Sequence, residues 1–259
     1  MGYFKQKLSG LRKRYKSAKY GIFYFKDSTF ILQERLCING RRKKFKFTNT
    51  SDAELAYEFN EICINDCYHL AELKKILPAA GIIVDIGANQ GLFAIAARQH
   101  FSRASITCYE PNRNLESILS HNTNLLNVQV FYEAVCLADC TLTLNPGKSD
   151  LHTQIRLAAK GDVIGTRFSK VFERAGDHID ILKVDCEGTE WELFEDSTSW
   201  MKVNAVTMEY HLWANTRKNV GDVINRLTYF GLTIISDKRL SNEFGLITAV
   251  RITRENNIH

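Results

Sequence analysis

The sequence of 259 residues predicts an α/β fold, in which a mostly parallel β-sheet carries helices on both faces. Three observations lead to this fold class. Short apolar runs alternate with helical segments from residue 81 onwards. A glycine-containing turn follows the first of these runs, where a strand would pass into a helix. The last two apolar runs have no helix between them, which indicates an antiparallel pair at the end of the chain.

The alternating part contains seven runs that we expect to form strands and four segments that we expect to form helices. The expected strands are 82–86, 105–109, 128–135, 179–184, 205–209, 232–236 and 247–253. The expected helices are 92–101, 114–126, 189–194 and 220–229. This order predicts a seven-stranded sheet.

The first fifty residues predict a basic helix followed by a β-hairpin. Apolar side chains recur every three or four positions, as on one face of a helix, at Phe4, Leu8, Leu11, Tyr15 and Ala18. Asn39-Gly40 is a preferred tight-turn sequence, so we expect a hairpin of strands 35–38 and 41–47, preceded by a strand at 28–33. Ser51 and Glu54 fit a capping box, which begins a helical stretch that we expect to extend to residue 77.

Charge divides the chain at residue 50. Residues 1–50 hold 14 Lys/Arg and 2 Asp/Glu, whereas the other 209 hold 20 and 27, for a net charge of +5. We therefore predict two units, a basic extension at 1–50 and a mildly acidic domain at 51–259. The extension can be interpreted as a solvated cover for the domain, as a segment that docks on an anionic membrane surface, or as an RNA-binding segment.

Composition and the lengths of apolar runs argue against a disordered chain, a membrane-spanning protein and a disulfide-rich miniprotein. With 45% hydrophobic and 24% charged residues, the chain has enough apolar material for a sizeable core. No apolar run reaches the roughly 20 residues that a membrane span needs. The seven cysteines are an odd number without zinc-knuckle spacing, so we expect free thiols. Because the N-terminus also lacks the apolar core of a signal peptide, we expect the cytoplasm, with peripheral membrane attachment as an alternative.

The first strand-turn, Val84-Asp85-Ile86-Gly87-Ala88-Asn89-Gln90-Gly91, lies where ligands bind in open α/β sheets. A dinucleotide fingerprint would need glycine at positions 89 and 92, but these are Asn89 and Leu92. A phosphate cradle is therefore disfavoured. Glu110 ends the second strand, where a carboxylate can accept hydrogen bonds from both ribose hydroxyls of a nucleoside.

Four motifs occur in order: VDIGANQG from Val84, YEPN from Tyr109, AV at Ala134, and LKVDCEGTE from Leu182. Over roughly residues 54–252 the chain thereby resembles the FkbM family of S-adenosylmethionine-dependent methyltransferases. The resemblance implies a Rossmann-like class I methyltransferase fold and O-methylation of a sugar or polyketide hydroxyl.

The resemblance also assigns the cofactor site. It implies that S-adenosylmethionine is held at its methionine moiety by Asp85, Gly87, Asn89 and Gly91. It places the ribose on Glu110 and the adenine edge at the backbone of Ala134.

The expected catalytic groups follow the fourth and fifth strands. An alcohol acceptor benefits from a general base or a metal ion. We predict His211 as the base, oriented by Glu209 or Asp185, because residues 209 and 211 point the same way in a strand. As an alternative, Asp185, Glu187 and Glu209 would hold Mg²⁺.

The leading hypothesis is a methyltransferase that modifies a hydroxyl of a glycan or another small molecule. We expect residues 139–178 to contribute to acceptor recognition, with Tyr210 and Trp213 as stacking or core residues. The alternatives are methylation of RNA, a nucleotide-dependent oxidoreductase, and a non-catalytic module that binds the cofactor. Nucleic acid is disfavoured, because the Asn-Pro-Pro-Tyr-like tetrapeptide of base methylation is missing.

Overall fold

The computed structural model describes residues 13–22, 32–48, 53–145, 154–157, 161 and 163–252. Its centre is a seven-stranded sheet. In spatial order the strands are β12 (Thr233–Arg239), β13 (Phe244–Val250), β11 (Val203–His211), β10 (Ile179–Val184), β3 (Ile82–Ile86), β4 (Ser105–Tyr109) and β5 (Gln129–Phe131). The pairs among β11, β10, β3, β4 and β5 are parallel, and both pairs that β13 makes are antiparallel. The predicted fold class is therefore confirmed, including the antiparallel final pair.

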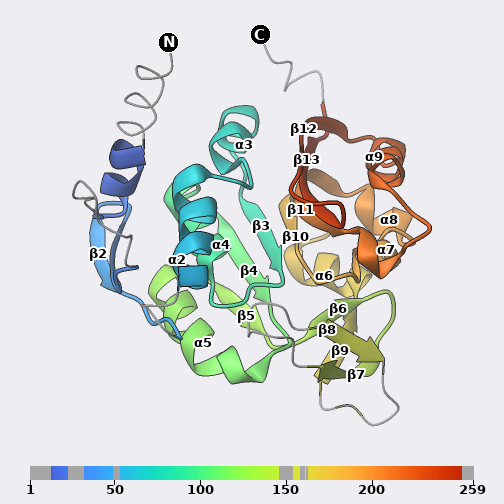
Figure 1. Ribbon diagram of the computed structural model, residues 1–259, viewed down its shortest axis with the longest axis horizontal. Helices are drawn as coiled ribbons and strands as arrows, with labels where there is room; N and C mark the ends of the chain where they lie inside the picture. Colours follow the sequence, from blue (N-terminus) through green and yellow to red (C-terminus); the bar gives the residue numbers. More distant parts are fainter. Residues whose placement is uncertain are drawn as a thin grey trace.

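Helices cover both faces of this sheet (Figure 1). One face carries α3 (Leu70–Ile76), α4 (Leu92–His100) and α5 (Glu116–Leu126), the last preceded by the 3-10 turn η2 (Arg113–Leu115). The other face carries α6 (Phe168–Ala175), α7 (Glu190–Leu193), α8 (Ser197–Trp200) and α9 (Val220–Tyr229). Successive strand residues alternate between the two faces, so Ile83 belongs to the first hydrophobic core and Val84 to the second.

The N-terminal part contains a helix at residues 13–19 and the hairpin of β1 (Arg35–Ile38) and β2 (Arg41–Lys44). Asn39 and Gly40 both have positive φ, 49° and 77°, as the predicted tight turn requires. The predicted apolar helix face is wrong in the described residues, because Tyr15 is 68% exposed and Ala18 is also exposed. The buried positions there are Ser17 and Tyr20. Phe4, Leu8, Leu11 and most of the expected strand at 28–33 lie outside the described residues.

The hairpin packs onto α4. Leu36 and Phe45 are fully buried and share a hydrophobic core with this helix. The Asn39 side chain donates a hydrogen bond to the Arg98 carbonyl at 2.8 Å. The division of the chain at residue 50 stays a prediction, but the apolar packing crosses it.

The expected helix at 51–77 is interrupted. It consists of α2 (Ala53–Phe59), the π-helix η1 (Asn60–Asn65) and α3. Asp66 and His69 have positive φ and separate η1 from α3. The carboxylate of Asp66 accepts hydrogen bonds from the backbone N–H groups of Leu70 and Ala71, which makes a new helix start favourable. Ser51, the expected cap, lies outside the described residues.

The run 128–135 forms two strands rather than one. β5 ends at Phe131, and β6 (Ala134–Cys136) joins a separate sheet beside the main one (Figure 1). The strands of this small sheet lie in the order β6, β9 (Val163–Arg167), β7 (Cys140–Asn145) and β8 (Gln154–Leu157). The sequence did not predict this sheet or α6, which occupy much of the 139–178 segment.

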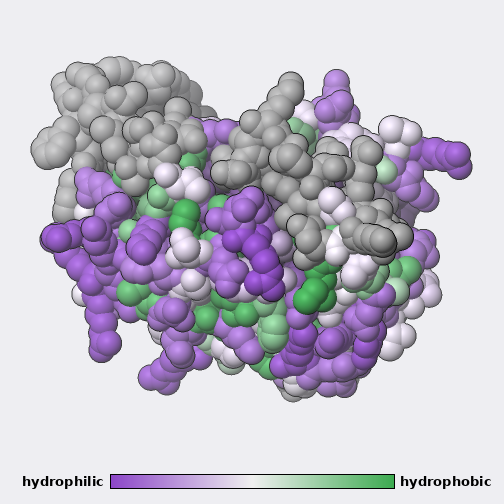
Figure 2. All heavy atoms as spheres, turned by 90° about the horizontal axis from the view of Figure 1, so that it is seen from below, coloured by the Kyte–Doolittle hydropathy of each residue, from purple (hydrophilic) through white to green (hydrophobic). Residues whose placement is uncertain are grey.

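The face seen in Figure 2 is largely hydrophilic among the coloured residues. Figure 2 shows small hydrophobic patches, separated by hydrophilic side chains, among the coloured residues of one face. Among the described helices, none has the length and apolar character that crossing a membrane requires.

Candidate active site

A cavity of about 480 Å³ lies at the carboxyl ends of β3, β4, β10 and β11. Parallel strands end at the same sheet edge, so the loops that follow them meet there. The α2–η1 segment and the β12–β13 pair complete the wall. Its charged lining residues are Glu54, Glu58, Glu61, Glu110, Glu133, Lys183, Asp185, Glu187, Glu209 and Lys238.

The turn after β3 brings two strand tips into contact. Gly87 has φ of +79°, and a Cβ there would lie 1.8 Å from the carbonyl oxygen of Asp185. Only glycine permits both this backbone conformation and this approach. The N–H groups of Gly87 and Ala88 also donate to the Tyr109 carbonyl. The turn is therefore fixed against both β4 and the loop after β10.

Glu110 fastens the same turn to the end of β4. Its carboxylate is buried and accepts hydrogen bonds from the N–H of Asn89 at 2.7 Å and of Asn112 at 2.8 Å. Burial raises the pKa of Glu110 to about 6, although the two N–H groups oppose this shift. Each oxygen uses one lone pair on these bonds, and a second remains for a ligand in the cavity.

Lys183 lies at the centre of the site, opposite Asp85 in the β3–β10 register. Its Nζ is 3.1 Å from Asp85 Oδ1 and 3.6 Å from Asp185 Oδ2, and it donates to the Gly87 carbonyl at 2.5 Å. Burial alone would lower the pKa of Lys183, but the carboxylates of Asp85 and Asp185 outweigh burial and raise it. The lysine therefore carries its charge and links the first and fourth strand tips.

Asp185 and Glu209 both face the cavity, in agreement with their position at strand ends. Asp185 accepts a hydrogen bond from the Tyr68 hydroxyl at 3.1 Å. Burial and then the charge of Asp185 raise the pKa of Glu209. Both carboxylates line the cavity and are therefore available to a molecule bound in it.

His211 lies behind the wall rather than on it. It is only 3% exposed and is absent from the described lining residues. Its Nδ1 is 3.1 Å from Glu190 Oε1, and its Nε2 is 3.5 Å from Glu209 Oε1. As expected, residues 209 and 211 point to the same side of β11.

The charges around His211 argue against its predicted role as the base. Burial lowers the pKa of His211, but hydrogen bonds to Glu190 and Glu209 raise it more, to about 11. An imidazolium ring, which is protonated on both nitrogens, cannot accept a further proton. Together with the burial of the ring, this favours a positioning role for His211 in this state, and its role as the base stays a prediction.

The family of the chain follows from a comparison with family models. Residues 85–234 match the model described as "Methyltransferase FkbM domain". The chain belongs to the FkbM methyltransferase family. It is thus an S-adenosylmethionine-dependent methyltransferase, and the oxidoreductase and non-catalytic alternatives are wrong.

Two named relatives are methyltransferases from fungi. Methyltransferase sdnD of Sordaria araneosa is 27% identical over 244 residues, which are 78% of this chain and 92% of that protein. Methyltransferase 1 of Beauveria bassiana is 26% identical over 189 residues, 61% of this chain and 74% of that protein. Among solved structures, the N-terminal domain of EvdMO1 with SAH bound is 13% identical with a TM-score of 0.47, and the match covers 84% and 91% of the two chains.

The cavity of this FkbM methyltransferase fits S-adenosylmethionine at four of the six predicted positions. Gly87, Asn89, Glu110 and Ala134 line it. The side-chain oxygen of Asn89 is buried and has no hydrogen-bond partner among the described residues, so it can accept a bond from an ammonium group. Glu110 can accept bonds from a ribose diol.

The other two predicted cofactor residues lie outside the cavity wall. Asp85 is fully buried behind it and contacts Lys183 and Cys108. Gly91 has φ of +88° and packs against α5, where a Cβ would lie 3.3 Å from Leu119. Both residues support the turn in this structure, and their contact with the cofactor stays a prediction.

The sequence analysis missed the lining residues of α2 and η1. Glu54, Glu58 and Glu61 line the wall, and their spacing of four and three could have indicated one helix face. Tyr210 and Trp213, in contrast, are absent from the described wall. Tyr210 is buried in the core, and Trp213 packs on the His211 ring at 5.6 Å between centroids.

Proposed function

We propose that this methyltransferase modifies a hydroxyl of an uncharged sugar or glycan. The observation that carries the proposal is the position of the Asp185 and Glu209 carboxylates on the cavity wall, beside the turn that fits the cofactor. A hydroxyl is a weak nucleophile until its proton is taken, so a carboxylate within reach favours an alcohol acceptor.

S-adenosylmethionine supplies a methyl group on a good leaving group, so the protein mainly has to align donor and acceptor. In the proposed arrangement, Asn89 holds the amino group of the cofactor and Glu110 its ribose hydroxyls. The Ala134 backbone lies at the adenine edge. Lys183 contacts both the Gly87 carbonyl and Asp185, so it fixes the position of the cofactor turn relative to the carboxylate beside the acceptor.

Glu209 receives the hydroxyl proton in this mechanism, in place of His211. Glu209 lies on the cavity wall, whereas His211 lies behind it. Asp185 is held by both Tyr68 and Lys183 and orients the acceptor. The imidazole of His211 positions Glu209 from 3.5 Å away.

The charge of the wall supports an uncharged acceptor. Eight of the described lining side chains are carboxylates, of which Glu133 is paired with Arg174, and two are lysines, of which Lys183 is paired with Asp85 and Asp185. Phosphorylated sugars and RNA would be repelled by such a wall. Hydroxyl groups, which can donate hydrogen bonds to carboxylates, would be attracted.

The basic N-terminal part supports a location at an anionic membrane surface on the cytoplasmic side. Arg41 and Arg42 are exposed on β2, and Lys13, Arg14 and Lys16 are exposed on the helix at 13–19. Basic side chains near an anionic surface each contribute about 1 kcal/mol to binding. All seven cysteines are free, which suits a reducing compartment. Binding to anionic liposomes that weakens as salt is added would test this location.

A labelled-methyl experiment tests the activity. The protein is incubated with deuterated-methyl S-adenosylmethionine and with neutral glycosides, phosphorylated sugars or RNA, and the products are analysed by mass spectrometry. We expect label on a hydroxyl of a neutral glycoside, lost in Glu209→Gln and kept in Glu116→Gln, a surface variant on α5. Label on RNA or on phosphorylated sugars alone would contradict the proposal.

A further inference from the structure

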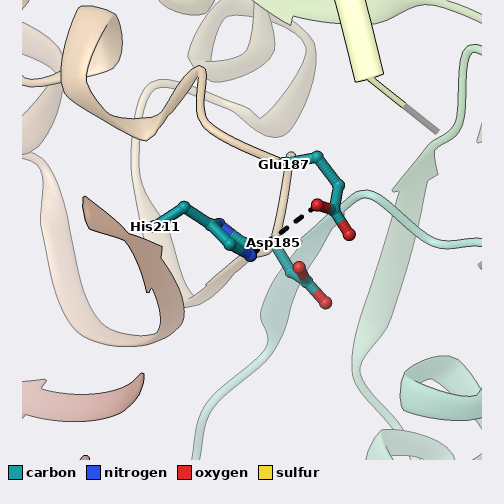
Figure 3. A group of neighbouring side chains, drawn as sticks. All are labelled: Asp185, Glu187 and His211. Atoms are coloured by element: carbon teal, nitrogen blue, oxygen red, sulfur yellow. Dashed lines mark ion pairs between the residues drawn. The ribbon is translucent and has the colours of Figure 1, made fainter. Parts of the chain in front are cut away.

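Three metal-ligating side chains converge at the acceptor side of the cavity. The donor atoms of Asp185, Glu187 and His211 lie within 4.8 Å of one another. Figure 3 shows the imidazole of His211 directed from β11 towards two carboxylates on the loop after β10. Nε2 of His211 is 3.8 Å from Glu187 Oε2. We propose that these three side chains bind one divalent cation of the Mn²⁺ class, a site that rests on and extends the proposed hydroxyl methylation.

A carboxylate behind the histidine sets its orientation. Glu190 is 1% exposed, and its Oε1 accepts a hydrogen bond from the Cys186 N–H as well as facing His211 Nδ1. An ionised carboxylate can only accept, so in the singly protonated ring that would bind a cation the remaining proton sits on Nδ1. The lone pair of Nε2 then points away from Glu190, towards Asp185 and Glu187. Metal-binding histidines regularly donate a hydrogen bond from the other ring nitrogen to a carboxylate, which fixes the orientation of the ring.

The negative charge of the cluster also favours a bound cation. Asp185, Glu187, Glu190 and Glu209 surround one imidazole. Among the described residues, Lys183 pairs with Asp185 of this group, and it shares its charge with Asp85. Four carboxylates in a partly buried site repel one another unless positive charge lies between them. Protonation of His211 offers one positive charge and a divalent ion offers two, so a direct binding measurement separates these explanations.

The ligand set differs from the one expected from the sequence. Glu209 is outside the group whose donors lie within 4.8 Å, and His211 takes its place. Two carboxylates and one imidazole suit Mn²⁺, which accepts oxygen ligands and tolerates nitrogen, better than Mg²⁺, which prefers oxygen alone.

The open side of the ion would face the acceptor. Asp185 and Glu187 both line the cavity, so an ion between them has coordination positions directed into it. A hydroxyl bound there loses its proton more readily. The proton passes to Glu209, the O–H bond breaks, and the oxygen electron pair forms the new bond to the methyl carbon while the C–S bond breaks.

Binding of Mn²⁺ itself tests the site. Free Mn²⁺ has an electron paramagnetic resonance signal that weakens when the ion binds protein, so a titration gives stoichiometry and affinity. We expect saturable binding of one ion per chain, weakened at least about 10-fold in Asp185→Asn and in Glu187→Gln. The matched control is Glu61→Gln, which removes a cavity carboxylate outside the cluster and should bind as the wild type does. All three positions are partly exposed, so thermal unfolding should show folded variants.

The outcomes separate the cation site from the proposed function. Absence of saturable Mn²⁺ binding, or equal binding by wild type and Glu187→Gln, overturns the site, and so does full methyl transfer by EDTA-treated protein. The hydroxyl methylation then still stands. If Glu187→Gln loses Mn²⁺ binding but the wild type transfers no methyl group to any hydroxyl, the cation site stands and the proposed function is overturned.

Discussion

The substitution Glu110→Gln separates two roles that one carboxylate fills in this structure. Glu110 accepts backbone N–H bonds from Asn89 and Asn112, and it is the group on which we place the cofactor ribose. Glutamine keeps the shape of the side chain but replaces one acceptor oxygen by a donor and removes the charge. Both the turn and the ligand should therefore lose bonds.

The expected magnitudes follow from the bonds counted above. A hydrogen bond to a charged group contributes about 1.5 kcal/mol or more, so two ribose bonds amount to roughly 3 kcal/mol. At about 1.4 kcal/mol per tenfold change, cofactor affinity should fall roughly 100-fold. One buried N–H would face the new amide donor, which should lower the free energy of unfolding by about 1–3 kcal/mol.

Two measurements on the same protein decide the matter. Calorimetric titration with S-adenosylmethionine gives the affinity, and urea unfolding without ligand gives the stability. Glu116→Gln is the control, because this exposed α5 side chain pairs with Arg113 and should change neither quantity appreciably. A cofactor affinity within about threefold of the wild type, even with lowered stability, would refute the ribose contact and leave Glu110 a support of the turn.

Three further predictions concern the same charges. Below about pH 6 Glu110 takes up a proton, so it can no longer accept hydrogen bonds with both oxygens. Cofactor affinity should therefore fall as the pH falls through 6. Calorimetry should show this fall in affinity in the wild type and not in Glu110→Gln. Lys183→Met should lower the free energy of unfolding by about 3–5 kcal/mol, because Asp85 would stay buried without its partner. Adding Asp85→Asn should restore part of the lost stability. A urea midpoint of Lys183→Met equal to that of the wild type would disprove a stabilising role for the Lys183–Asp85 pair. Tyr68→Phe removes a hydrogen bond to Asp185, so it should slow methyl transfer about 10-fold while leaving cofactor affinity unchanged. A parallel loss of methyl transfer and of cofactor affinity would contradict the proposal that Asp185 orients the acceptor.

The strands and their tips could be predicted because their signals are local. Each apolar run of the main sheet is short and continuous, and the turn at Gly87 carries its own glycine. Parallel strands then bring their carboxyl ends together, so Glu110, Asp185 and Glu209 could be placed on one edge from topology alone. Their presence on the cavity wall agrees with that reasoning.

The missed features depend on contacts between distant residues. The run 128–135 divides between two sheets at Glu133, whose carboxylate pairs with Arg174, forty-one positions later. Burial lowers the pKa of His211, and hydrogen bonds to Glu190 and Glu209 raise it more; no spacing rule connects Glu190 to this histidine. Asp85 belongs to the cofactor motif, but the motif does not predict its ion pair with Lys183 on the neighbouring strand.

The packing of the hairpin against α4 bears on how the protein can be shortened. A chain that started at residue 51 would expose the side of α4 now covered by Leu36 and Phe45, and would leave the Arg98 carbonyl without the Asn39 amide. Several buried aliphatic and aromatic groups would then meet water, at about 25 cal/mol for each Å² uncovered. Such a truncated enzyme should self-associate during purification, so expression of the full chain is the sound starting point for crystallisation and assay.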